Sequence, residues 1–241
     1  MPPKSPRPRR IIAHAPPESF VGRAEQLREI TSLASPKAGR QGVILLAAPR
    51  SGASELLRQS FDELFRQRGG ATPVYFAFTR DDAASTAAAR RFLHTFLTQT
   101  IAHRRDDSSL VTASPTLRAL LELAAPSDYE WVERLIQNFE RATDEGDERA
   151  LVRLCFGAPQ QAAARGVRTV VMLDDVHVAE SLRGEVSLGH SVADAAESGS
   201  PFVLAGLRRR MLDLVNGAGQ HAGLDSLRKL HLDKLKESDA R

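Results

Sequence analysis

Residues 42–58 read Gly-Val-Ile-Leu-Leu-Ala-Ala-Pro-Arg-Ser-Gly-Ala-Ser-Glu-Leu-Leu-Arg, and this stretch decides the fold. An apolar run typical of a buried strand leads into a Pro/Gly turn and then into a helix. The phosphate-loop template G-x-x-x-x-G-K-[ST] falls on Ala47 to Ser54. Gly52 and Ser54 match it, whereas Ala47 replaces the first glycine and Ala53 replaces the lysine. The sequence therefore predicts the frame of a phosphate-binding loop without its main cation.

The loop chemistry still favours an anion. Pro49, Ser51, Gly52 and Ala53 can form a tight turn whose N–H groups point at phosphate oxygens, and the helix dipole from Ser54 onward adds positive potential. Losing the lysine removes a charge-assisted bond of about 1.5–3 kcal/mol, which is roughly ten- to a hundredfold in affinity.

Arg50 is a candidate for that missing charge, although it stands earlier in the loop. Taken alone, the motif is also compatible with an ordinary strand-turn-helix connection.

A second motif supports the first. Residues 169–175 form an apolar run that ends in Asp174 and Asp175, which is the form of a Walker B strand. Asp174 would hold Mg²⁺ through water, and Asp175 would orient or deprotonate the attacking water. Acids at the carboxyl end of a buried parallel strand lie where α/β sheets bind ligands. The alternative is a strand followed by an Asx turn.

The whole chain alternates strands with helices. Strands are expected at 43–46, 74–78, 169–173, 202–205 and 229–232, and helices at 24–33, 54–68, 86–103 and through most of 105–165. This pattern predicts an α/β fold: a three-layer P-loop NTPase-like core with a five-stranded, mainly parallel sheet and a helical insertion before the Walker B strand.

Composition places the chain among globular proteins of the cytoplasm. Hydrophobic residues make up 42% of 241 residues, no apolar run approaches a membrane span, and no secretory signal is visible. The single cysteine, Cys155, suits a reducing compartment and is expected to be a buried structural thiol. The seven histidines show no metal-binding spacing.

Charge is concentrated at the N-terminus. Lys4, Arg7, Arg9 and Arg10 carry four positives, and removing them from the net +3 leaves −1. Residues 1–17 are predicted to be a disordered, proline-rich basic tail. Such a tail could contact nucleic acid or an acidic partner, or could simply be a solvated leader.

Three blocks together resemble a known family: Phe20-Val21-Gly22-Arg23 with Gln26-Leu27, Ala47 to Ser54, and Leu173-Asp174-Asp175-Val176-His177. Their order and spacing are similar to the STAND and origin-recognition-type branch of AAA-like P-loop ATPases, over residues 18–236. The resemblance implies strand order 5-1-4-3-2 and binding of ATP or ADP with Mg²⁺.

The resemblance also implies roles for particular residues. Val21, Gly22 and Arg23 would lie near adenine and ribose, Ser54 and Asp174 would hold the metal, and Arg208 would be the sensor arginine after the fourth strand.

The departures from the family pattern shape the expected function. Ala53 puts hydrolysis in doubt, Ala47 narrows the loop, and residues 237–241 stand about where a helical lid would begin. We expect a nucleotide-binding regulatory or assembly module with weak or absent ATP hydrolysis and with a protein partner or self-association. The alternatives are an active ATPase with a substitute cation, from Arg50 or a neighbouring subunit, and a DNA-associated AAA-like protein that uses the basic tail.

Overall fold

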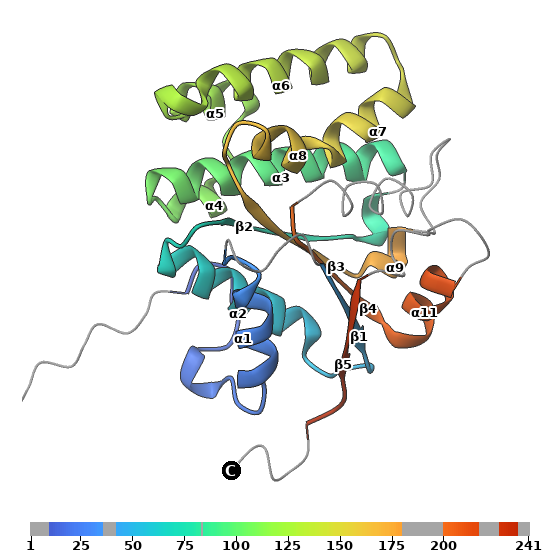
Figure 1. Cartoon of the computed structure of the whole chain (residues 1–241). Coiled ribbons are helices and arrows are strands. Elements are labelled where there is room, and N and C mark those ends of the chain that lie inside the picture. The colour runs from blue at the N-terminus through green and yellow to red at the C-terminus, as the bar shows by residue number, and fades with distance from the viewer. Residues whose placement is uncertain (1–9, 36–41, 83, 180–199, 217–226, 236–241) are drawn as a thin grey trace, which may run out of the picture.

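One parallel sheet organises the molecule (Figure 1). The structure is a computed structural model that describes residues 10–35, 42–82, 84–179, 200–216 and 227–235. The strands are β1 Val43–Ala47, β2 Thr72–Ala77, β3 Thr169–Asp174, β4 Phe202–Leu207 and β5 Arg228–Leu232. They pair in the order β2-β3-β4-β1-β5, and every pairing is parallel. The predicted fold class and strand order are confirmed, and the fold is compatible with that of a P-loop protein.

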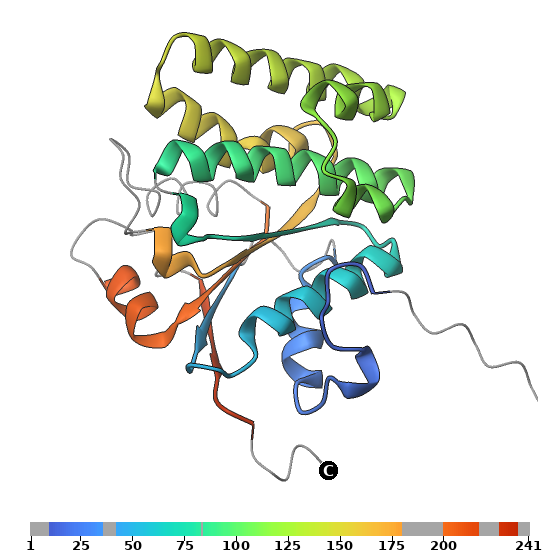
Figure 2. The same ribbon diagram turned by 180° about the vertical axis from the view of Figure 1, so that it is seen from behind.

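Helices cover both faces of this sheet (Figures 1 and 2). One face carries α1 Ala24–Ser32 and α2 Ala53–Gln67, and the other is covered first by α3 Ser85–Arg105. The remaining helices are α4 Ser109–Ala113, α5 Leu117–Leu123, α6 Pro126–Asp144, α7 Glu148–Phe156, α8 Ala158–Ala163, α9 Val176–Ala179 and α11 Arg208–Asn216. Within the described part of the chain, no helix is both long and apolar enough to cross a membrane.

The buried strands explain why their sequences are continuous apolar runs. In β1, Ile44 and Leu46 point into the core formed with α3, whereas Val43 and Leu45 point into the core formed with α1 and α2. A strand that is buried on both faces has no solvent side on which polar residues could alternate.

The helical insertion before β3 is present as α4 to α8. Its helices α7 and α8 pack against α3, and α5 and α6 form the outer layer, in which α6 packs against α5 and α7 (Figures 1 and 2). Ser114-Pro115 has the sequence form of an N-cap followed by proline at the first helical position, but no helix begins there. Ser114 has φ +47°, and α5 begins instead after Thr116, whose Oγ1 accepts a hydrogen bond from the Ala119 N–H at 3.2 Å. Cys155 is fully buried in α7, and burial raises the pKa of its thiol to about 12.

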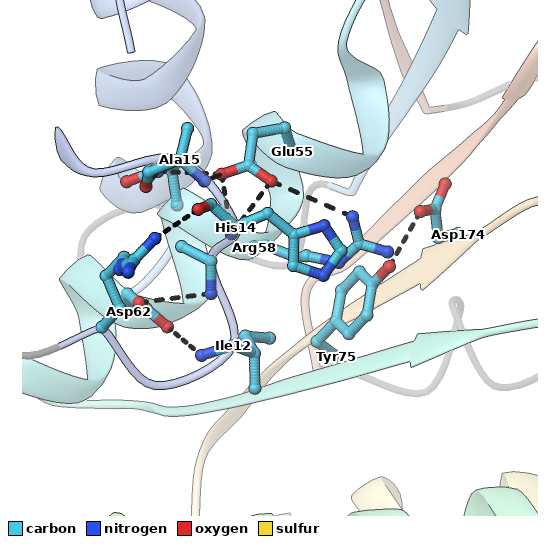
Figure 3. Close-up of polar contacts among 11 residues, drawn as sticks. Ile12, His14, Ala15, Glu55, Arg58, Asp62, Tyr75 and Asp174 are labelled. Atoms are coloured by element: carbon cyan, nitrogen blue, oxygen red, sulfur yellow. Dashed lines mark hydrogen bonds and ion pairs between the residues drawn. The ribbon is translucent and has the colours of Figure 1, made fainter. Parts of the chain in front are cut away.

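The N-terminal segment is ordered further than the sequence suggested. Residues 11–15, which we call the strap, lie along α2 instead of in a disordered tail that runs to residue 17 (Figure 3). Asp62 accepts hydrogen bonds from the N–H groups of residues 11, 12 and 13 at 2.9, 2.9 and 3.4 Å. Glu55 accepts from those of residues 14 and 15 at 3.1 and 2.8 Å. Two carboxylates on one helix face therefore pair with five successive N–H groups.

Asp62→Ala should release the strap. Asp62 is buried at 2% exposure, and its loss leaves three N–H groups without their acceptor, so residues 11–13 should detach into water. We expect a loss of about 1–3 kcal/mol in unfolding free energy, the range for hydrogen bonds to a charged group, and fast amide exchange in residues 11–15. Hydrogen exchange with mass spectrometry and urea unfolding measure the two effects.

Glu63→Ala is the matched control, because Glu63 is on the same helix but, among the residues that the structure describes, pairs only with Arg66 and Gln67 at the surface. Equal exchange of residues 11–15 in both variants would show that Asp62 does not hold the strap.

Candidate phosphate-binding site

The parallel register brings the two predicted motifs to one edge of the sheet. β1 ends at Ala47, which pairs with Leu207 of β4, and β3 ends at Asp174 on the other side of β4. A cavity of about 360 Å³ opens there between the loop and the acids. Loop residues 50–54 line it together with Asp174 and Asp175, so the structure brings these predicted residues together.

The loop itself has the backbone of an anion site. Arg50 has φ +59° and Gly52 φ +84°, with Ser51 between them at a negative φ. Such alternation turns successive N–H groups toward one side, as in the nests that bind anions. A Cβ on Gly52 would meet nothing within 4 Å, so glycine is favoured here by its backbone angle rather than by space.

Two features leave hydrogen-bonding capacity in this loop. α2 begins at Ala53 with Gly52 as N-cap, and no side chain caps its first turn. Its first N–H groups therefore have no side-chain acceptor, and the helix dipole favours an anion in front of them. Ser51 is buried at 4% exposure, and its Oγ has no hydrogen-bond partner among the described residues.

Asp174 is fixed by its neighbours. It is 2% exposed; its Oδ2 accepts a hydrogen bond from the Tyr75 hydroxyl at 2.9 Å, and its Oδ1 accepts from the Asp175 N–H at 2.9 Å (Figure 3). Burial and the charge of Asp174 raise the pKa of Tyr75, so that hydroxyl remains a donor at neutral pH. Each carboxylate oxygen keeps a further lone pair for water or for the hydration shell of a metal ion.

Asp175 is in a less favourable backbone and charge environment than Asp174. Its φ is +52°, and its side chain is half-exposed, with Oδ1 4.0 Å from Nδ1 of His177. Burial and the neighbouring Asp174 raise the pKa of the Asp175 carboxyl. A carboxylate held in a left-handed backbone beside a second carboxylate costs stability, which is common at functional sites.

A metal ion at this site would have oxygen donors. No cluster of three or more His, Cys, Asp or Glu side chains that could hold a metal occurs in the described ranges. Mg²⁺ does not need such a cluster, because it keeps several waters and binds through one or two carboxylates plus substrate phosphates. Ser54, Asp174 and Asp175 line the same cavity and fit that donor set.

The predicted adenine-side residues lie elsewhere. Val21 and Gly22 are exposed, and neither is among the described residues that line this cavity. Arg23 is 7% exposed, and its Nη2 donates to the carbonyl oxygen of Ser51 at 3.0 Å and to that of Asp233. Arg23 therefore supports the loop through its hydrogen bond to the Ser51 carbonyl oxygen. Its role near ribose stays a prediction.

Arg208 and Pro49 belong to a neighbouring cavity. Both line a space of about 580 Å³ beside the loop, next to α11. Arg208 Nη2 lies 2.6 Å from Asp233 Oδ1, and this hydrogen bond and the arginine's charge lower the pKa of Asp233. A sensor role for Arg208 would require its guanidinium to leave Asp233.

Sequence reasoning missed several residues of the site. Arg58, Tyr75 and His14 are near the acids or line the cavity (Figure 3). Gly206 of β4 lines the cavity as well. Strand alternation was the available signal for Tyr75, because Phe76 beside it points into the opposite core. A Cβ on Gly206 would come within 2.7 Å of the Met211 sulfur and 3.1 Å of His177 Nδ1, so a larger residue there would require the Met211 side chain to move.

Comparisons with known proteins give no match, so the function is inferred from the geometry of the site. No protein-family model, no curated protein sequence and no solved structure matches the chain.

Asp175→Asn should stabilise the ligand-free protein at neutral pH. The raised pKa means that the folded state disfavours ionised Asp175, and asparagine also tolerates a positive φ. Allowing for solvent screening of this half-exposed group, we expect Tm to rise by about 2 °C at pH 7. The gain should shrink as pH falls through the raised pKa, because wild-type Asp175 then becomes neutral too.

Thermal unfolding at pH 7 and pH 4 measures this difference, with the exposed Asp81→Asn as the matched control. A lower Tm at pH 7 for Asp175→Asn than for the wild type would contradict the account of this acid pair.

Proposed function

We propose that this chain is a P-loop NTPase-like, AAA/STAND-type nucleotide-binding module that serves as a regulatory or assembly part. It binds ATP or ADP with Mg²⁺ weakly and hydrolyses ATP slowly or not at all. One observation carries the proposal: the uncapped N-terminus of α2 and the positive-φ loop before it share a cavity with the acids that end β3. This arrangement offers N–H donors to phosphates and carboxylates to a hydrated cation.

Each residue has a role in this proposal. The N–H groups of residues 51–54 bind phosphate oxygens, and Ser54 and Asp174 hold the Mg²⁺ ion, Asp174 through water. Asp175 orients the attacking water when hydrolysis occurs at all. Mg²⁺ supplies charge neutralisation for the phosphates when it is bound.

Weak hydrolysis follows from the missing lysine. The charge at position 53 normally stabilises the transferring phosphoryl group, so its absence reduces transition-state stabilisation more than ground-state binding. Arg208, the expected sensor, is engaged by Asp233.

A second candidate function is an active ATPase with a substitute cation. It is favoured by the fact that Arg50 and Arg58 both line the cavity. Binding of nucleic acid through the basic tail stays a prediction, because Lys4, Arg7 and Arg9 lie outside the described residues. Binding of a protein partner and self-association also stay predictions.

Ala53→Lys tests the phosphate loop. The variant restores a cation at the position where the template places it, so Mg-ATP should bind roughly ten- to a hundredfold more tightly. Thermal unfolding in the presence of Mg-ATP should rise correspondingly, because ligand binding to the folded state alone stabilises it. Asp174→Ala is the control and should reduce the part of the gain that depends on Mg²⁺. Absence of Mg-ATP binding by both the wild type and Ala53→Lys would mean that residues 47–54 do not bind phosphate.

Steady-state turnover tests the second part of the proposal. We expect ATP hydrolysis far below about 1 s⁻¹, the low end for working enzymes. A phosphate-release assay with wild type and Asp175→Asn measures it. Turnover at ordinary enzymatic rates that disappears in Asp175→Asn would establish the active ATPase instead.

A further inference from the structure

We propose that Arg58, on the second turn of α2, supplies the positive charge that the loop lacks, and that the site thereby takes an anion with two or more linked phosphates. This inference rests on the proposed nucleotide binding and concerns the same cavity. It identifies the ligand class by its charge, so a nucleoside is not required for recognition.

The position of Arg58 on α2 directs it to the site. Ser54 and Arg58 are four residues apart, so they share one face of the helix, and both line the cavity with Asp174. The Arg58 guanidinium carbon lies 5.5 Å from the centroid of the Tyr75 ring, and Tyr75 donates to Asp174. Figure 3 shows the guanidinium between His14 and the Tyr75–Asp174 pair. The cation is therefore held beside the acids and not in bulk solvent.

The charge of Arg58 is poorly compensated within the protein. Its side chain is 23% exposed, and the one carboxylate within 4.0 Å of it in the described residues is Glu55, at 3.9 Å. The oxygens of Glu55 already accept hydrogen bonds from the strap and from Gln59 Nε2 at 2.9 Å. A largely buried cation with a distant and shared partner retains donors for a ligand.

Two other arginines in the chain are paired much more closely with acids that are themselves buried. Arg91 Nη2 lies 2.6 Å from Oδ2 of buried Asp82, and Arg104 Nε lies 2.5 Å from Oδ2 of buried Asp128. Each makes a two-pronged contact with its acid, which is the usual arrangement of a structural arginine. Among the described residues Arg58 makes no such two-pronged contact, so its donors remain available to a ligand.

Arg58 also suits the task better than Arg50. Arg50 is exposed and belongs to the loop, whereas Arg58 extends from a fifteen-residue helix and rests on an aromatic ring. A cation that is already oriented loses less side-chain entropy on binding.

Binding of Mg-ATP and of magnesium tripolyphosphate to single variants tests the assignment by calorimetry. Arg58→Ala should weaken both ligands roughly ten- to a hundredfold, and Arg58→Lys should retain part of the affinity, since a point charge replaces a two-pronged donor. Arg66→Ala is the matched control, because Arg66 is on the same helix and pairs with Glu63 at the surface. It should bind as the wild type does. Equal affinity of wild type, Arg58→Ala and Arg58→Lys overturns the inference.

A double variant that moves the positive charge from position 58 to position 53 provides a second readout, which does not depend on a single variant. If Arg58 does the work of the loop lysine, Ala53→Lys should rescue Arg58→Ala and should gain more affinity in that background than in the wild type. The same gain in both backgrounds would show that the two positions act independently and would overturn the inference.

The two proposals fail in different ways. If wild type and Ala53→Lys both bind neither ligand, the nucleotide-binding function itself is wrong, and this inference falls with it. If wild type binds and Arg58→Ala binds equally well, only the role of Arg58 is wrong. Circular dichroism and Tm confirm that each variant is folded before it is titrated.

Discussion

The hydrogen bonding of β4 between β1 and β3 is the constraint on which the site depends. Parallel pairing places Ala47 of β1 opposite Leu207 of β4. It also places Asp174, at the end of β3, on the other side of β4 at the same edge of the sheet. The loop and the acids are thereby separated by a single strand, whose Gly206 lines the cavity between them. The cavity is a consequence of this register, because a one-residue slip of β4 would put Leu207 or Ala205 where the glycine lies.

Charge, more than shape, distinguishes this cavity from a working ATPase site. It contains two adjacent carboxylates and no lysine in the loop, so its ligand-free state carries a repulsion that raises the pKa of Asp175. Among the described residues that line it, Arg50, Arg58 and the N-terminus of α2 provide opposing positive charge or potential. A polyphosphate with Mg²⁺ would balance these charges, which is the physical reason to expect binding without efficient turnover. The strap is linked to the charge balance of the cavity, because Glu55 accepts hydrogen bonds from the strap and also lies beside Arg58.

The sequence predicted the fold and the centre of the site better than its periphery. The strands, the loop and the acid pair depend on local signals, namely apolar runs, a glycine in the turn and acids directly after a strand, whereas the strand order was implied only by the family resemblance. The strap depends on hydrogen bonds that Asp62 and Glu55 accept from N–H groups about forty to fifty residues earlier in the chain. No periodic pattern in the sequence predicts such contacts. Arg208 stands where the family pattern places it, but its partner Asp233 could not be foreseen from spacing. The place of Arg58 in the site could have been predicted from the sequence, because Arg58 follows Ser54 by about one helical turn.

The most direct measurement is the mapping of backbone amide shifts by NMR as Mg-ADP is added to the wild-type protein. The account predicts that the largest changes fall on the N–H groups of residues 50–54, with accompanying changes at Asp174, Asp175 and the side-chain Nε–H of Arg58. The exposed residues Val21 and Gly22 report at the same time whether the base reaches the segment before α1. Absence of shifts at residues 50–54 at millimolar Mg-ADP, or shifts confined to the neighbouring cavity of Pro49 and Arg208, would contradict the central claim that this loop binds phosphate.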